Sequence, residues 1–250
     1  MDVIAVINQK GGVAKTTTAH NIAAGLHNRG RDVIMVDMDA QGSLSSILGA
    51  DRNRVTILDV LLRKAKAAQA IQRAGTLDII ASSDDMAAEG ILTATGKEFR
   101  LREALQALER PGSVIIIDCP PSLGILTINA LTAATSILIP CQADSLSLEA
   151  LRQLQPTIDT IKRYTNPSLR LSGVLLTRYN GRAVLSREVA EMIEAEAAKM
   201  GTKVFKTRIR EGIAIKEAQA FHSDIFAYDP KSNGAKDYDA LLDELEKGGK

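Results

Sequence analysis

The chain has 250 residues, 45% of them hydrophobic, which suffices for a large core and favours one α/β domain spanning residues 1–250 over two small ones. Its 31 Lys and Arg residues nearly balance 30 Asp and Glu residues, which excludes a general positive field for nucleic acid and an acidic, disordered composition. Two cysteines exclude a disulfide framework and a paired zinc motif, and with no leader or apolar run of transmembrane length we expect a soluble, cytoplasmic protein.

Short β-branched segments alternate with helical segments along the chain. The predicted strands, apolar at nearly every position, are residues 2–7, 32–37, 77–81, 113–118, 136–140 and 171–177. Such continuous apolar runs are typical of parallel strands that are covered on both faces. The intervening segments, such as 15–30 and 99–112, show helical spacing and end at glycine or proline. Because strand–helix–strand crossovers are right-handed, the pattern predicts a doubly wound, mostly parallel α/β sheet with ligands beyond the carboxyl ends of its strands.

The first predicted strand leads into INQKGGVAKTTTAH, residues 7–20. Glycines let consecutive N–H groups face a phosphate, and the N-terminus of the following helix adds favourable partial charge. Lys15 is expected to contact the β- and γ-phosphates of ATP, and the Thr16 hydroxyl is expected to bind Mg²⁺. A glycine-rich turn that only connects strand to helix is the alternative. The nucleotide-binding candidates in this loop are Gly11, Gly12, Val13, Ala14, Lys15, Thr16 and Thr17.

The loop departs from the usual pattern G-x-x-x-x-G-K-[ST] because Ala14 occupies the position of the second glycine. Its methyl group lies where the backbone must approach phosphate closely. If φ at Ala14 is negative and the Cβ points away, the cost is small; otherwise nucleotide affinity falls. Since every other active-site position is intact, we expect a working but slow ATPase rather than a nucleotide-binding relic.

Acidic residues end two of the predicted strands. VIMVDMDAQG places Asp37 and Asp39 after one strand, and VIIIDCPPSLG places Asp118 at the end of another. A carboxylate at the end of a buried strand is costly unless a metal or a lysine compensates its charge. Asp118 is therefore assigned to the Mg²⁺ shell, with Gly124 in a switch-like segment, and Asp39 to orienting the attacking water. Capping of a helix over SLSSIL remains the alternative for either Asp37 or Asp39.

These motifs resemble those of ParA/Soj-type partition ATPases, within the deviant Walker A group of P-loop NTPases that includes MinD. The resemblance covers nearly the full chain in the blocks NQKGGVAKTTT (8–18), VDMDAQGSLS (36–45), IIIDCPPSLGILTINAL (115–131), IPCQADSLSLEAL (139–151), LLTRYNGR (175–182), VFKTRIREGIAIKEA (204–218) and YDPKSNGAKDY (228–238). It implies an ATP- and Mg²⁺-dependent homodimer that binds double-stranded DNA without sequence preference. It further implies nucleoid association, and release when a ParB-like centromere-binding protein stimulates hydrolysis.

The same resemblance gives roles to three further residues. Lys10 is the signature lysine that reaches the nucleotide of the partner subunit, where a second cation stabilises charge developing during phosphoryl transfer. From the residues alone, Lys10 is a solvated loop lysine. Arg178 and Asn180, in LLTRYNGR, are candidates for the neighbourhood of the adenine, although a plain strand-to-loop transition has the same pattern.

The expected DNA-binding region also departs from the family. Relatives carry IPRNVRLSEA, whereas this chain has IREGIAIKEA (209–218), with Glu211 and Ala214 in place of two arginines. A local basic face would give salt-dependent affinity for DNA of any sequence. Ordinary solvated charge is the alternative for each residue. The residues proposed for this face are Arg182, Arg187, Lys203, Lys206, Arg208, Arg210 and Lys216.

Two other functions compete with DNA partition. A MinD-like membrane-cycling ATPase should end in a basic amphipathic helix, whereas the tail KDYDALLDELEKGGK is acidic and would be repelled by anionic lipid, so we expect no membrane partner. A metabolic P-loop ligase or synthetase would need a substrate pocket that the sequence does not reveal. No helix-turn-helix module precedes the ATPase core, so we do not expect operator binding.

Overall fold

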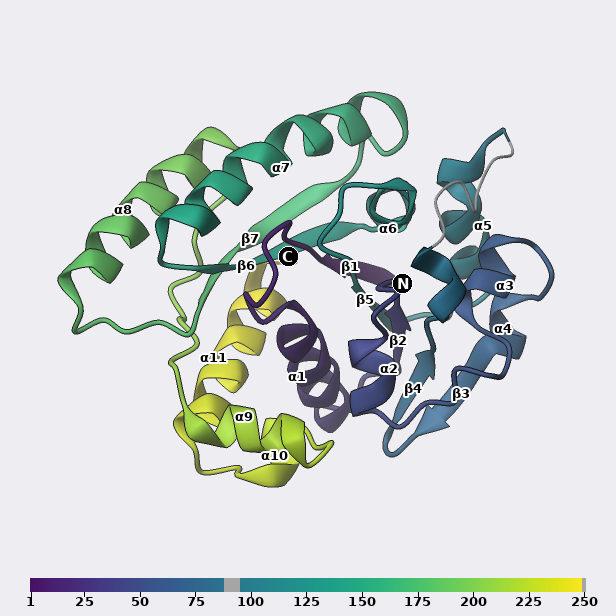
Figure 1. The fold of residues 1–250 in the computed structure, drawn as a ribbon, viewed down its shortest axis with the longest axis horizontal. Coiled ribbons are helices and arrows are strands. Elements are labelled where there is room, and N and C mark those ends of the chain that lie inside the picture. Colours follow the sequence, from purple (N-terminus) through teal and green to yellow (C-terminus); the bar gives the residue numbers. More distant parts are fainter. Residues whose placement is uncertain (88–94, 249–250) are drawn as a thin grey trace.

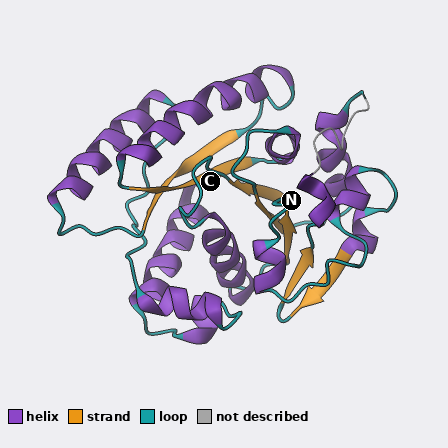
Figure 2. Ribbon diagram, viewed as in Figure 1, coloured by secondary structure: helices purple, strands orange, loops and turns teal. Residues whose placement is uncertain are grey.

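The computed structural model describes residues 1–87 and 95–248. A seven-stranded sheet in the order β3-β4-β2-β5-β1-β6-β7 runs through the middle of the molecule, with helices on both of its faces (Figure 1). Figure 2 shows the strands as a single twisted layer between the helices. The strands are β1 (Asp2–Val6), β2 (Val33–Asp37), β3 (Ile71–Ala74), β4 (Leu77–Ile80), β5 (Val114–Asp118), β6 (Ser136–Gln142) and β7 (Arg170–Thr177).

The helices lie in the connections between the strands and, from α8 onward, after the last strand. They are α1 (Lys15–Asn28), α2 (Ser43–Ile47), α3 (Ile57–Leu61), α4 (Ala67–Ala70), α5 (Arg100–Gln106), α6 (Ile125–Ala133), α7 (Ser145–Tyr164), α8 (Val184–Lys199), α9 (Ile213–Ala220), α10 (Ile225–Tyr228) and α11 (Asn233–Gly248), with short 3₁₀ turns at Asp84–Ala87 and Lys97–Phe99. Within the described ranges, no helix combines the length and the apolar character needed to cross a bilayer.

The prediction of a doubly wound, mostly parallel sheet is confirmed. All six predicted strands form and pair in parallel where they are neighbours. The pattern missed β3, which pairs antiparallel with β4 at the edge of the sheet. Its residues alternate between buried and more exposed positions, because an edge strand does not need the continuous apolar run of a central one. The predicted helix 99–112 is shorter, since α5 ends at Gln106.

Each face of the sheet has its own hydrophobic core. One core lies under α3, α5, α6, α7 and α8, and includes Ala5, Ile117 and Ile139 from the central strands. The other lies under α1, α10 and α11, and includes Val6 and Ile116. Strands buried on both sides must be apolar at successive positions, which explains the runs seen in the sequence. The two cores fix the sheet, and so the carboxyl ends of β1, β2 and β5 stay aligned at one edge.

The C-terminal helix α11 belongs to this fold. Tyr238, Leu241 and Leu242 are fully buried against the core beneath α1. On the outer side, Arg29 at the end of α1 forms ion pairs of 2.6 to 2.9 Å with three acidic residues of α11, namely Asp239, Asp243 and Glu246. The apolar face of α11 is therefore used within the chain, where a membrane-binding helix would need it free.

Candidate functional site

A cavity of about 790 Å³ opens at the carboxyl edge of the sheet. The glycine-rich loop after β1, the loop after β2, Pro121 after β5, residues 209–212 and one face of the helix that follows them line it. Ligands in open α/β sheets bind at this edge, where the strand order changes direction on either side of β1. The volume also lies in the range of about 300–1,000 Å³ that is usual for small-molecule sites.

The glycine-rich loop is hydrogen-bonded to the ends of β6 and β7, two strands that lie on one side of β1. The Gln142 amide at the end of β6 donates to the Gly12 carbonyl at 3.1 Å. The Thr177 hydroxyl at the end of β7 donates to the Val13 carbonyl at 3.0 Å. The Val13 side chain is fully buried beneath the loop, whereas Gly11, Gly12, Thr16 and Thr17 line the cavity. These contacts hold the backbone in place before any phosphate arrives.

Ala14 has a left-handed backbone conformation, with φ 66° and ψ 35°. Its carbonyl accepts the first hydrogen bond of α1, from the Thr18 N–H at 2.9 Å, so the conformation is part of the helix start. Of the two possibilities open from the sequence, the structure has the costly one. A residue with a Cβ in this region is destabilised by about 1–2 kcal/mol relative to its preferred conformations. The position therefore suits glycine, as the usual loop pattern has it.

We expect Ala14→Gly to stabilise the fold by about 0.5–1 kcal/mol, because relief of the left-handed strain exceeds the added entropy of the unfolded chain. Urea unfolding measures this change. Ala198→Gly is the matched control, since Ala198 is exposed in α8 with negative φ and its replacement should cost about 0.5–1 kcal/mol. Equal destabilisation of both variants would show that Ala14 is unstrained.

Lys15 and Asp118 are two buried ionisable residues beneath the glycine-rich loop. Lys15 is 8% exposed, and its ammonium donates to the Lys10 carbonyl at 3.2 Å. Burial lowers the pKa of Lys15, and the charges of Asp118 and Asp39 oppose that shift. Burial and the neighbouring Asp37 carboxylate raise the pKa of Asp118 well above its ordinary value. Burial thus disfavours the ionised forms of both groups, and the Asp37 charge adds to this at Asp118, until a ligand compensates them.

The surroundings of Asp118 fit a divalent cation. Within the part of the chain that the structure describes, neither Asp118 carboxylate oxygen accepts a hydrogen bond, although the side chain is buried. Such an orphaned carboxylate calls for a partner, and oxygen donors are what Mg²⁺ prefers. Thr16 supplies a hydroxyl from the cavity wall next to Lys15. Asp118 and Thr16 are therefore suitable residues to hold Mg²⁺.

Asp37 and Asp39 have different surroundings although they are two residues apart. The Asp37 carboxylate accepts hydrogen bonds from the Ser45 N–H and hydroxyl at 2.8 and 2.7 Å, in the first turn of α2. Asp37 thus acts at a helix N-terminus, as the capping alternative proposed. The Asp39 carboxylate accepts only from the Gln41 N–H, at 3.0 Å among the described residues, and it lines the cavity. Of the two, Asp39 is placed to act on a bound ligand.

Lys10 lies beside the cavity and is held by its own chain. Its ammonium contacts Asp144 at 2.6 Å, Ser147 at 3.2 Å and Gln142 at 3.3 Å. Asp144 also caps α7 by accepting from the Ser147 N–H at 2.8 Å. Burial alone would raise the pKa of Asp144, but the hydrogen bonds from Lys10 and Ser147 hold it below its ordinary value. Lys10 is thus an anchored lysine at the rim, not a solvated one.

Arg178 and Asn180, the candidates for the adenine neighbourhood, are separated by the structure. Arg178 lines the cavity and has a positive φ of 49°. Asn180 does not line it, and its side chain instead accepts from the Arg182 N–H at 3.1 Å in the turn after β7. Only Arg178 is placed to contact a ligand here.

The predicted basic residues follow the outer edge of the sheet. Residues 203–210 run in extended form beside β7, with Phe205 and Ile209 buried against the core. Three of the predicted DNA contacts form ion pairs within the chain: Arg208 with Glu194 at 3.2 Å, Arg210 with Asp237 at 2.6 Å, and Lys216 with Glu211 at 3.1 Å. The cations without an ion-pair partner among the described residues are Arg182, Arg187, Lys203 and Lys206. These four are the ones available to an external phosphate.

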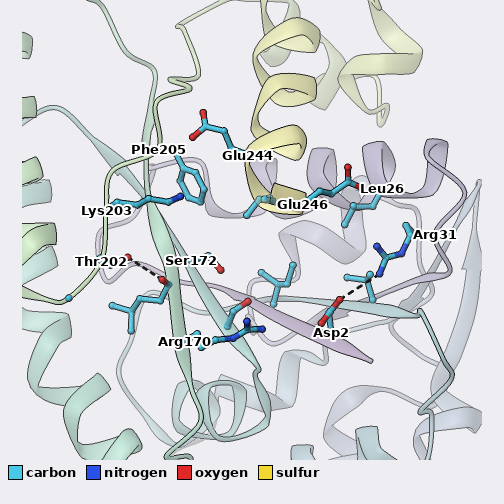
Figure 3. Close-up of a pocket in the computed structure, with 16 residues that line it drawn as sticks. Asp2, Leu26, Arg31, Arg170, Ser172, Thr202, Lys203, Phe205, Glu244 and Glu246 are labelled. Atoms are coloured by element: carbon cyan, nitrogen blue, oxygen red, sulfur yellow. Dashed lines mark hydrogen bonds and ion pairs between the residues drawn. The ribbon is translucent and has the colours of Figure 1, made fainter. Parts of the chain in front are cut away.

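A second cavity, of about 680 Å³, lies at the opposite edge of the sheet, where β1, β5, β6 and β7 begin (Figure 3). Phe205 and Leu26 contribute to its apolar walls. Its charged side chains are balanced, with three carboxylates and three cations, namely Asp2, Glu244, Glu246, Arg31, Arg170 and Lys203. Balanced charge does not select a polyphosphate, and the glycine-rich loop lies at the other edge. The nucleotide site is therefore assigned to the carboxyl edge.

Comparison with known proteins places the chain in a family. The AAA domain family matches residues 1–171. The chromosome partitioning protein ParA of Myxococcus xanthus is 40% identical over 251 residues, which cover 98% of this chain and 88% of that protein. The sporulation initiation inhibitor protein Soj of Bacillus subtilis is 39% identical over 253 residues, covering 99% of both chains. The chain belongs to the ParA/MinD family. The predicted resemblance to ParA/Soj-type proteins is confirmed.

Solved structures of other P-loop ATPases agree with this membership. A cobyrinic acid a,c-diamide synthase from Mycobacterium smegmatis, with bound ADP and magnesium, is 35% identical with a TM-score of 0.85, covering 100% of this chain and 97% of that one. The cell division ATPase MinD of Pyrococcus furiosus is 29% identical with a TM-score of 0.79, covering 98% of both chains. The fold is thus that of the P-loop ATPases of the ParA/MinD family.

Proposed function

We propose that this ParA/MinD-family chain is a DNA partition ATPase. It dimerises with ATP, binds double-stranded DNA without sequence preference, and is released when a ParB-like centromere-binding protein stimulates hydrolysis. One observation carries the proposal: the glycine-rich loop, Lys15, Asp39 and Asp118 meet at one edge of the sheet, in a chain 40% identical to a chromosome partitioning protein. Such binding would associate the protein with the nucleoid in the cytoplasm.

The chain's own residues divide the work of phosphoryl transfer. N–H groups of the loop from Gly11 to Thr17 hold the phosphates, and Lys15 contacts the β- and γ-phosphates. Asp118 and Thr16 would hold Mg²⁺, which when bound neutralises charge on the phosphate oxygens. Asp39 orients the attacking water through its cavity-facing carboxylate. The division follows from position, because Lys15 and Asp118 are buried beneath the loop, whereas the half-buried Asp39 carboxylate faces the cavity.

Side chains at the starts of α7 and α8 support an ATP-dependent homodimer. Leu146, Val184 and Leu185 are 69%, 59% and 68% exposed at the starts of α7 and α8. The Lys10–Asp144 pair lies at the same end of α7. Exposed apolar side chains of this kind are buried in subunit interfaces. In the proposed dimer Lys10 leaves Asp144 and reaches the partner's phosphates, where its charge stabilises the transition state.

A metabolic P-loop function is the second candidate, favoured by the 35% identity to the cobyrinic acid a,c-diamide synthase. A membrane-cycling function has less support, because the outer face of α11 is acidic and its apolar face is buried against the core. Nucleotide-dependent DNA binding separates these functions. Gel-shift titrations with ATP, ADP and no nucleotide, at two salt concentrations, should show binding with ATP alone, weakening steeply with salt and equal for unrelated sequences. Absence of DNA binding under every condition would favour the metabolic function.

We expect Lys203→Gln with Lys206→Gln to weaken DNA binding by about tenfold at low salt and to lower the salt slope by about one for each phosphate that is no longer neutralised. Both side chains are exposed beside β7, and neither has an ion-pair partner in the described ranges. Lys162→Gln with Arg163→Gln, at the end of α7, removes the same charge elsewhere as a control. Equal DNA affinity of the two double variants would place the DNA on another face.

Arg208 and Arg210 are poor probes of the same surface. Arg210 donates to both carboxylate oxygens of Asp237, whose side chain is 11% exposed. Reversing the charge of Arg210 would leave that nearly buried carboxylate uncompensated against a second negative charge and would destabilise the fold. A loss of DNA binding would then not report on DNA contact.

A further inference from the structure

A carboxylate at the mouth of the nucleotide cavity binds two of its cations. Glu211 accepts a hydrogen bond from the Arg178 guanidinium at 3.2 Å and another from the Lys216 ammonium at 3.1 Å, both on the same oxygen. All three side chains line the cavity. They come from the end of β7, the loop that follows residues 203–210, and α9. The bridge therefore spans one wall of the cavity.

The Glu211 carboxylate disfavours binding of the nucleotide that the cavity is proposed to take. The hydrogen bonds and charges of Lys216 and Arg178 lower the pKa of Glu211, so the side chain is a carboxylate at neutral pH. That negative charge repels a polyphosphate directly. It also engages two cations that would otherwise attract one. Lys15 and the backbone N–H groups remain the main phosphate ligands, so Glu211 modulates affinity without blocking the site.

We propose that Glu211 sets the nucleotide affinity of the cavity by competing with the phosphates for Arg178 and Lys216, which assigns Arg178 to the phosphates and not to the adenine. The inference rests on the proposed nucleotide site and names a residue that tunes it. Bound nucleotide draws the two cations away from Glu211, and the bridge re-forms when nucleotide leaves. Because the competition is electrostatic, its strength grows with the charge of the ligand and falls with salt.

The size of the effect follows from charge and distance. Glu211 is 49% exposed, so its field acts largely through solvent. One unit charge at roughly 8 Å in a water-like medium changes affinity about twofold for each ligand charge. By repulsion alone, removing the carboxylate should therefore raise affinity about fivefold for Mg·ATP, with two net charges, and about twofold for Mg·ADP, with one, and the release of Arg178 and Lys216 adds to both gains. Adenosine, without charge, should bind equally to both forms.

Calorimetric titrations with ATP, ADP and adenosine in the presence of Mg²⁺ test whether the gain in affinity decreases from ATP to ADP and vanishes for adenosine. Glu211→Gln keeps the shape of the side chain and removes its charge, and both residues suit an exposed loop. Glu217→Gln is the matched control, because Glu217 lies on α9, six residues after Glu211, but accepts from the Tyr228 hydroxyl at 3.1 Å and does not line the cavity. The graded gain should appear for Glu211→Gln alone, and should shrink at high salt.

A variant that lacks both cations tests whether Glu211 competes with the phosphates for them. In a chain carrying Arg178→Gln and Lys216→Gln, removal of the Glu211 charge should change ATP affinity less than in wild type, because no cation remains to be released. Unchanged or weaker ATP binding by Glu211→Gln would overturn the inference, even if wild type binds ATP as proposed. Absence of ATP binding by wild type would instead overturn the nucleotide site, and the inference with it.

Discussion

Replacing Lys15 with alanine should weaken ATP binding at least about 100-fold, because one cation makes charge-assisted hydrogen bonds to two phosphates, each contributing about 1.5–3 kcal/mol. Lys15 is 8% exposed, and burial already lowers its pKa, so its charge is costly without an anion. ATP is expected to offset that cost. Calorimetric titration of the full chain with ATP measures the loss, and ATP-dependent DNA binding should disappear with it.

Lys10→Ala provides the matched control for this prediction. Lys10 precedes the same glycines, but its ammonium is bound to Asp144 and it does not line the cavity. ATP binding by the Lys10→Ala monomer should stay within about threefold of wild type, the range of an exposed ion-pair effect. Wild-type affinity in Lys15→Ala would remove the phosphate-loop assignment, whereas equal losses in both variants would point to collapse of the loop.

The sequence predicts the parts of this molecule whose physical cause is local. Parallel strands covered on both faces must be apolar throughout, so the six parallel strands stand out, while the antiparallel edge strand β3, with its alternating burial, does not. The loop and the acidic strand ends were also found, because phosphate binding needs residue types at fixed spacing. At Ala14, however, the sequence left two conformations open, and only the backbone decided between them.

Partners that are distant along the chain left no such pattern. Lys10 meets Asp144 across 134 residues, and the Ser45 side chain that engages Asp37 looks like any serine in a short helix. The basic residues beside β7 illustrate the same limit. Composition shows cations there, but only the fold shows that Arg210 is already bound to Asp237 whereas Lys206 has no ion-pair partner among the described residues. Such ion pairing depends on tertiary geometry, so the basic residues counted in the sequence overestimate the number that are available to bind DNA.

Replacing Asp39 with alanine should leave ATP binding within about threefold of wild type and lower hydrolysis about 100-fold or more, the usual contribution of a positioned base. The loop should keep its shape, since its main-chain bonds remain: Asp39 N–H to the Asp37 carboxylate at 3.1 Å and Gly42 N–H to the Asp39 carbonyl at 2.8 Å. Single-turnover phosphate release measures the hydrolytic step. ATP-bound, DNA-competent dimer should therefore accumulate in this variant.

Two further substitutions separate charge from loop geometry. Asp39→Asn keeps an oxygen for the Gln41 N–H, which Asp39 binds at 3.0 Å, and removes only the charge. If the carboxylate orients water, Asp39→Asn should hydrolyse ATP as slowly as Asp39→Ala; recovery to the wild-type rate would mean that the side chain only shapes the loop.

Asp37→Asn should behave differently. Because Asp37 is buried and bound to Ser45, its amide would weaken charge-assisted bonds at α2 and lower the free energy of unfolding by about 1–3 kcal/mol. Loss of hydrolysis with full stability in Asp39→Asn, against loss of stability in Asp37→Asn, would assign the chemistry to Asp39.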